Sequence, residues 1–304
     1  MKRMKILQVG ILSALAAVAL FGLFGFDIEE IIAASGGNIE ANREITQTYE
    51  IAALLDLTVE SANGYVVVQS DAVANVTVTA HLRSRADTLE KAQERVNAIV
   101  VDMIQTGDNL VVRYRSADQS DDVRRYSGVS FDVTVPAQAD VEVDSSNGAI
   151  TISGIEGQFN LDTSNGAIDL NDLVGVVNAD TSNGRIDVRG FRGSLDLETS
   201  NGAIDIEDVE ASVEARTSNG RIDFAGVLVG DSHDLRTSNG AMLVRVAPDA
   251  SITFNASTSI GSISTNLPLV GDTDGRAWTA TLNPPAVQTL ELRTSNGSIR
   301  IEGL

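Results

Sequence analysis

A four-residue motif, Ser or Thr followed by Ser-Asn-Gly, recurs at a regular interval and limits the folds open to this chain. Its first five copies lie eighteen residues apart, and the next lies twenty further on. The Asn-Gly pairs are Asn147-Gly148, Asn165-Gly166, Asn183-Gly184, Asn201-Gly202, Asn219-Gly220, Asn239-Gly240 and Asn296-Gly297. Thr258-Ser259-Ile260-Gly261 resembles a decayed copy between the last two. Repetition of this kind is typical of repeat proteins, in which each unit buries its apolar side chains against its neighbours.

Apolar and polar residues alternate on both sides of each glycine. Ile168 and Leu170 follow Gly166 at every second position, as on one side of a strand. Leu195 and Leu197 show the same alternation in the second half of a coil. Each eighteen-residue coil therefore holds two short strands whose apolar sides face each other. Because one coil buries too little surface to fold alone, we expect coils stacked ~4.8 Å apart. The prediction is an all-β fold, a parallel β-solenoid with ~18-residue coils over residues 141–304.

The Asn-Gly pairs are expected to form the corners of the coils. Glycine readily adopts the positive φ of a tight corner, and asparagine tolerates it better than most residues. Stacked asparagines can also hydrogen-bond from coil to coil as a ladder. Antiparallel hairpins use Asn-Gly turns too, and they are the main alternative. The strict period with identical corners favours stacking. Ser61-Ala62-Asn63-Gly64 looks like an outlying copy ahead of the repeats.

Residues 45–140 are predicted to form an N-terminal cap together with the first strands. A helix over 88–105 has an apolar stripe that ends near Met103, and Asp87 with Glu90 resembles a capping box at its start. A solenoid needs its open end covered to avoid edge-to-edge aggregation. We therefore expect this helix to cap the stack.

The start of the chain resembles an export signal. Three basic residues precede an uncharged, largely apolar run over residues 6–26, which as a helix can just cross a hydrocarbon core of ~30 Å. Basic residues ahead of it place the N-terminus in the cytoplasm and the rest outside. Residues 1–34 are thus a signal anchor, or alternatively a signal peptide cleaved near Ala33, and residues 35–44 form a tether. We expect an extracytoplasmic protein of the cell envelope, held in the cytoplasmic membrane by residues 6–26.

The composition excludes several classes of function. With 22 basic and 42 acidic residues the formal net charge is −20, which argues against nucleic acid as a partner. The absence of cysteine removes disulfides, thiolate metal sites and thiol nucleophiles. Two histidines, His81 and His233, are too few for a histidine metal cluster. Trp278 stands in a segment over 268–285 that reads as irregular, and we expect it to cap the far end of the stack.

Four aspartates occupy the same outward position in successive coils and are the candidate metal ligands. They are Asp169, Asp187, Asp205 and Asp223. At ladder spacing each neighbouring pair would repel by about 1 kcal/mol in water, and calcium could relieve that repulsion. Arg185 and Arg221 lie two residues before two of these aspartates and offer a simpler neutralisation through ion pairs. We expect the ion-pair network, with a calcium-binding β-roll as the alternative.

A second column in the repeat looks like a flat ligand-binding array. It consists of Thr163, Thr181, Thr199, Thr217 and Thr237. Its parity with Leu161 and Leu197 places these threonines on the inward side of their strands, so we expect them to be structural.

A polysaccharide-active enzyme is a further alternative, because two acids that flank a glycosidic bond suffice for hydrolysis. The aspartates of the ladder share one setting, so nothing drives the pKa of one away from that of another. No nucleophile elbow, P-loop or dinucleotide fingerprint occurs. We predict no catalytic residue, no cofactor and no enzymatic activity.

The run Phe131 to Pro136, the first Ser-Asn-Gly copy at 145–148 and the closing run 290–299 together resemble a bacterial family known as putative adhesins. The resemblance covers about residues 45–304. It implies an exported, β-helical, non-enzymatic domain of largely unknown function that is often linked to the envelope. The resulting hypothesis is a non-catalytic, adhesin-like scaffold or interaction domain, with the membrane and an unknown envelope or surface partner.

Overall fold

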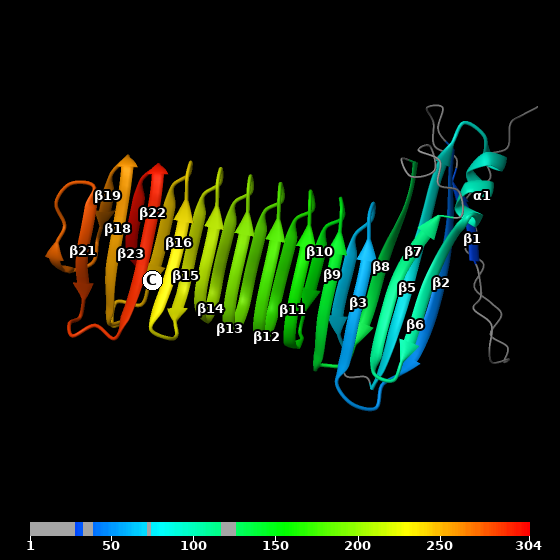
Figure 1. Cartoon of the computed structure of the whole chain (residues 1–304), viewed down its shortest axis with the longest axis horizontal. Helices are drawn as coiled ribbons and strands as arrows, with labels where there is room; N and C mark the ends of the chain where they lie inside the picture. The colour runs from blue at the N-terminus through cyan, green and yellow to red at the C-terminus, as the bar shows by residue number, and fades with distance from the viewer. Residues whose placement is uncertain (1–27, 33–38, 72–73, 117–125) are drawn as a thin grey trace, which may run out of the picture.

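A computed structural model describes residues 28–32, 39–71, 74–116 and 126–304, and in it the chain forms a long rack of stacked coils (Figure 1). Each coil contributes one strand segment to each of two faces. We call face A the one whose strands run into the Ser-Asn-Gly corner, and face B the one whose strands leave it. Between the ends of the rack, neighbouring strands on each face are parallel. The parallel stacking predicted from the repeat is confirmed, and the hairpin alternative is wrong for these coils.

Face A contains, in spatial order, β6 (Ile99–Thr106), β7 (Asn109–Ser116), β3 (Leu55–Ser61), β9 (Ala139–Ser145), β11 (Glu156–Thr163), the second halves of β12 (Ile168–Thr181), β13 (Ile186–Thr199) and β14 (Ile204–Thr217), then β16 (Ser232–Thr237), β22 (Gln288–Asn296), β18 (Ile252–Ile260), β21 (Ala277–Leu282) and β20 (Val270–Asp272).

Face B contains β1 (Ile28–Ile32), β2 (Ile39–Glu50), β5 (Asn75–Ala86), β8 (Ser127–Val135), β4 (Val66–Ser70), β10 (Ile150–Ser153), the first halves of β12, β13 and β14, then β15 (Ile222–Leu228), β17 (Met242–Val246), β23 (Ile299–Gly303) and β19 (Ile263–Thr265).

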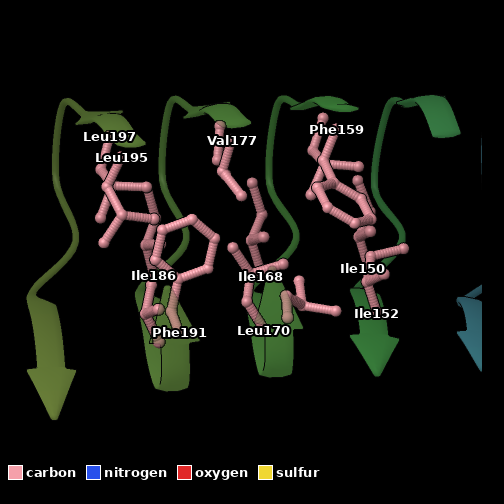
Figure 2. Packing of buried hydrophobic residues seen from close by; sticks show 14 of the residues in the cluster. Ile150, Ile152, Phe159, Ile168, Leu170, Val177, Ile186, Phe191, Leu195 and Leu197 are labelled. Atoms are coloured by element: carbon pink, nitrogen blue, oxygen red, sulfur yellow. The ribbon is translucent and has the colours of Figure 1, made fainter. Parts of the chain in front are cut away.

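Equivalent residues of successive coils pair directly, which aligns the inward side chains into columns. Ile168 pairs with Ile186, and Ile186 pairs with Ile204. Figure 2 shows Ile168 and Ile186 between the two faces, together with Phe159 and Phe191. All of them are almost fully buried. Each such side chain stabilises the fold by about 1.5–3 kcal/mol, so the stack gains with every coil what one coil lacks.

Both ends of the stack depart from chain order. The last coil, β22 and β23, lies between the β16–β17 coil and β18–β19, as Figure 1 shows by the red strands between the yellow and the orange ones. At the other end, β3 and β4 lie between β7–β8 and β9–β10. The decayed copy at 258–261 therefore stacks outside the C-terminal coil, although it lies between the last two copies in sequence. The copy at 61–64 is a full member of the stack.

Antiparallel strands close the ends. At the N-terminal end β6 pairs with β7, and β2 and β8 both pair with β5, all antiparallel. At the C-terminal end β18 pairs with β21, which pairs with β20. The segment over 268–285, predicted to be irregular, thus contains two strands. The parallel run thus ends in antiparallel strands, and on face A at the C-terminal end the outermost described strand, β20, is only three residues long, which keeps its open edge short.

The predicted helix over 88–105 is correct only in its first half. Helix α1 spans Leu89–Asn97, and residues 99–106 form β6 instead. The β-branched residues from Ile99 onward suit a strand that pairs along its whole length with β7, and this pairing outweighs the apolar stripe. The N-cap is Thr88, whose hydroxyl accepts a hydrogen bond from the Lys91 N–H, whereas Asp87 binds the Lys91 ammonium. The capping box predicted at Asp87 is wrong.

Helix α1 packs against β2, β5 and β6 at the N-terminal end, with Ala92 and Val96 buried there. This agrees with the predicted capping role. Residues 39–44, predicted to be part of a tether, begin β2, and residues 28–32 of the predicted signal segment form β1. No helix among the described residues is long and apolar enough to cross a membrane. The predicted anchor over 6–26 lies outside the described residues.

The corners of the coils are built as predicted, but for a different reason. None of the seven corner glycines has a positive φ. Instead, a Cβ added to Gly184 would collide with the carbonyl oxygen of Gly166 in the neighbouring coil, and the same holds at every copy of the motif. Glycine is selected at the corner by the close approach of two backbones. Positive φ occurs at the bend between faces B and A, for example at Gly175 and Gly193.

Candidate functional site

The corner asparagines form one continuous ladder along the edge of the rack. The side-chain amide of each donates to the side-chain oxygen of the one before it, over 2.7 to 3.0 Å, from Asn296 back to Asn63. The ladder stops at Asn296 because Ile260 occupies the next position. The predicted ladder is confirmed, and since it engages these amides with each other, we assign the corner a structural role.

The threonine column before the corner is buried, as its parity predicted. Thr181 is 1% exposed; its hydroxyl donates to the Gly166 carbonyl of the neighbouring coil at 3.0 Å and accepts from the Gly184 N–H at 3.1 Å. Thr163 and Thr199 make the same pair of bonds. These threonines join successive coils and do not form a ligand-binding array.

The four candidate calcium ligands lie in one column on face B, where arginines neutralise them. Arg185 forms ion pairs with both Asp169 and Asp187. Arg221 lies 2.6 Å from Asp205, and Arg245 lies 2.7 Å from Asp223. Asp187, whose side chain is 2% exposed, also contacts Arg189 at 3.4 Å. The predicted ion-pair network is present, and calcium binding stays an untested alternative. The described residues contain no metal-binding group of three or more His, Cys, Asp or Glu side chains.

The two histidines lie apart from each other. His233 is buried on β16 opposite Val213, as predicted, and burial lowers its pKa. His81 lies on β5 in the N-terminal cap, beside Glu44 and Asp132. Trp278 is buried on β21 near the C-terminal end, in agreement with its expected capping role.

A second carboxylate column on face A, together with two acids of the column beside it, was missed by the sequence analysis. Seven exposed carboxylates lie on β3, β9, β11, β12 and β13, and we call them the acidic strip. They are Glu60, Glu142, Asp144, Asp162, Asp180, Asp196 and Glu198. None has a hydrogen bond or ion pair to another side chain in the described part of the chain. A hollow of about 290 Å³ runs along six of them, with Asn160 and Asn178 in its lining.

Further along the same column the charge reverses. The positions that continue Asp180 and Glu198 hold Arg216, Arg236 and Arg293. Each of these arginines pairs with an acid two residues before it, such as Asp234 at 2.6 Å from Arg236. The charges of these three arginines are therefore neutralised by acids of their own strands, whereas the carboxylates of the acidic strip have no such ion pairs among the described residues.

The sequence carries a signal for this column. The residue immediately before the motif is Glu60, Asp144, Asp162, Asp180 and Glu198 in the first five coils that carry the motif, and arginine in the next three. The four aspartates after the glycine are easier to recognise because they share one residue type. The position before the motif holds Asp, Glu or Arg, and only the pairing between coils shows which of these charges are neutralised.

Mutual repulsion in the strip is visible in two pKa values. Partial burial, and then the charges of Asp180 and Asp144, raise the pKa of Asp162; partial burial, and then Glu198, raise the pKa of Asp180. A raised carboxyl pKa means that the folded state binds protons more readily than the unfolded state does. Stability is therefore reduced at neutral pH and recovers as the pH falls through the raised pKa.

Removing both charges is expected to stabilise the fold. Asp162→Asn/Asp180→Asn should increase the free energy of unfolding at pH 7 by roughly 0.5–1 kcal/mol, since like charges on neighbouring strands cost about that much. The gain should shrink as the pH falls through the raised pKa values of the wild-type carboxyls, because protonation then removes the same charges. Urea unfolding at several pH values checks this. Asp169→Asn, which removes the partner of Arg185, is the control and should give no gain. A double variant less stable than wild type at pH 7 would refute the argument.

One family model, described as Toastrack DUF4097, matches residues 54–302. Several solved structures are similar, and three of them are the following. A "putative adhesin" from Parabacteroides distasonis shares 13% identity at a TM-score of 0.48, covering 86% of this chain and 97% of its own. A "putative adhesin" from Bacteroides fragilis shares 11% at 0.38, with the same coverage. A "putative lipid binding protein" from Parabacteroides distasonis shares 10% at 0.35, covering 86% and 96%. No curated protein is similar enough to count as a match.

Proposed function

The chain belongs to the Toastrack DUF4097 family, and from that premise we propose that it is a non-catalytic, adhesin-like interaction domain of the cell envelope whose acidic strip binds a cationic partner. The observation that carries the proposal is the strip itself. Five of the seven carboxylates occupy equivalent positions of successive coils, and none of the seven forms an ion pair with a described side chain.

The strip costs stability that the fold could have avoided. On face B the same chain places arginines beside its aspartates, and the second half of face A pairs each arginine with an acid. Unrelieved repulsion in one column is the pattern expected where charges serve binding. A partner rich in lysine or arginine would relieve the repulsion and form ion pairs at several coils, and the acidic field would attract it from a distance.

The setting of the carboxylates favours binding over catalysis. Acid–base catalysis by two carboxylic acids requires environments that drive their pKa values apart. Asp162 and Asp180 instead have pKa values raised in the same direction, largely by the same cause, on an exposed face. The envelope location rests on the basic residues and apolar run at the start of the chain, which predict export.

The test compares two variants with equal loss of charge. The full chain is reconstituted in phosphatidylcholine vesicles, and its affinity for a surface coated with oligolysine is measured. The strip variant is Asp162→Asn/Asp180→Asn/Glu198→Gln. The control, Asp172→Asn/Asp208→Asn/Glu210→Gln, removes three exposed charges at the bend between the faces. Both raise the net charge by three, so general electrostatic attraction falls equally.

The strip variant should bind about tenfold more weakly than the control, because three exposed ion pairs are worth roughly 0.5 kcal/mol each. The difference should decrease with added salt. Equal weakening in the two variants would mean that oligolysine senses only the total charge, and the strip would then not be a binding site.

A further inference from the structure

A second hollow, unrelated to the acidic strip, lies on face B within the N-terminal cap. Its volume is about 380 Å³, and its lining comes from strands β2, β5 and β8 and from Tyr65, which immediately precedes β4. The lining includes Asn42, Glu44, Tyr65, His81, Arg83 and Ser130. The hollow lies outside the regular repeats.

The repeat pattern is interrupted where the hollow forms. Tyr65 follows the glycine of the first motif copy, where the next coils have Ala149 and Ala167. The strand outside it, β8, carries the small residues Gly128 and Ser130 opposite Arg83 and His81 of β5. Small residues between larger side chains leave a depression on an otherwise flat face. Tyr65 remains 43% exposed beside it.

Hydrogen bonds hold the polar side chains of the hollow in place. The Tyr65 hydroxyl lies 3.3 Å from a carboxylate oxygen of Asp132. His81 bridges two carboxylates, with Nε2 at 2.7 Å from Asp132 and Nδ1 at 3.3 Å from Glu44. The side chains of His81, Asp132 and Glu44 are 38%, 44% and 49% exposed. The ring of Tyr65 and two fixed acceptors are therefore oriented before any ligand arrives, and all are accessible.

Arg83 supplies a donor that nothing else uses. It is exposed, and it has no hydrogen bond or ion pair within the described residues. Most arginines of this acidic chain are paired, as Arg185, Arg221 and Arg245 are. A planar guanidinium with free N–H groups can donate two parallel hydrogen bonds to a hydroxyl pair or to a carboxylate.

We propose that this hollow is a saccharide-binding site that accepts one pyranose unit of a glycan. An accessible aromatic ring packs against the apolar C–H face of a sugar, while fixed acceptors and donors around it bind the hydroxyls. Tyr65 supplies the ring, Asp132 and Glu44 the acceptors, and Arg83 with Asn42 the donors. Arg83 would also bind the carboxylate of a uronic acid. The site goes beyond the proposed function and uses none of the acidic strip.

The test uses the full chain in phosphatidylcholine nanodiscs and three trisaccharide probes: cellotriose, chitotriose and tri-galacturonate. Binding is measured by saturation-transfer NMR and by titration. Tyr65→Ala installs the residue that later coils carry at this position, so the coil should fold, and it should weaken binding at least tenfold. Arg300→Gln, at an exposed arginine further along face B, is the control for Arg83→Gln and should leave binding unchanged.

The pattern across probes identifies the sugar. Loss of tri-galacturonate binding alone in Arg83→Gln would support an acidic saccharide, and equal binding of all three probes would support a neutral pyranose. Failure of the wild-type chain to bind any probe, or binding unaffected by Tyr65→Ala, would overturn the proposal. The strip variant Asp162→Asn/Asp180→Asn/Glu198→Gln should bind saccharide as the wild type does, so the two sites can fail independently.

Discussion

Gly184→Ala is expected to destabilise the fold by about 3 kcal/mol, more than any surface substitution in the repeats. The added Cβ would collide with the carbonyl oxygen of Gly166, and neither backbone can turn aside. Both glycines lie in corners between strands that pair with neighbouring coils, so relief requires that two coils separate at the corner. That separation would also strain the Asn183–Asn165 and Thr181–Gly166 hydrogen bonds.

Urea unfolding of the detergent-solubilised full chain, followed by circular dichroism, measures this effect. Ser182→Ala, at an exposed position in the same corner, is the matched control and should change stability by less than about 0.5 kcal/mol. If Gly184→Ala behaves like the control, the corner can widen without cost. Close backbone approach would then not explain why glycine recurs there.

Thr181→Val is expected to cost about 2–4 kcal/mol although it keeps the shape of the side chain. The hydroxyl donates to the Gly166 carbonyl and accepts from the Gly184 N–H. With valine, both backbone groups lose their partner in a site that is 1% exposed, and an unsatisfied buried polar group costs about 1–3 kcal/mol.

Thr181→Ser separates the hydrogen bonds from the packing. It keeps the hydroxyl and removes one methyl group, and the Ser145 hydroxyl, two coils away, already accepts the corresponding hydrogen bond from the Gly148 N–H. The serine variant should therefore lose only about 1 kcal/mol. A valine variant as stable as the serine variant would show that the hydroxyl contributes little and that packing alone keeps the column.

Some errors of the sequence analysis have a common physical cause. The apolar spacing over 88–105 fits a helix, yet residues from Ile99 onward pair with β7, a partner that lies beyond a local pattern. The glycine at each corner was assigned to a positive φ, because a turn is a local feature, whereas the actual constraint is the carbonyl of another coil. In both cases the deciding contact comes from a different part of the chain.

The candidate sites divide along the same line. The aspartate column of face B could be recognised from spacing, and its neutralisation by Arg185 and Arg221 could be anticipated, since all of these residues repeat together. The acidic strip was missed because its carboxylates are distinguished by the absence of ion pairs with described side chains, and the sequence does not show which side chains lie within reach. The hollow beside Tyr65 is lined by strands β2, β5 and β8, and the repeat does not predict that these strands lie next to Tyr65.

The sequence by itself determined the coil, its two faces, its inward columns and its asparagine ladder. These follow from a local period repeated along the chain, because each coil contacts only its nearest neighbours and equivalent residues must then align. Only the tertiary structure decided the spatial order at the two ends. The coil at 55–70 lies between β7 and β9, which follow it in the sequence, and the coil at 288–303 lies between β16 and β18, which precede it. It also decided which column of carboxylates is neutralised by arginines and which is not. Both depend on pairing between segments distant in sequence, and the repeat period carries no information about that pairing.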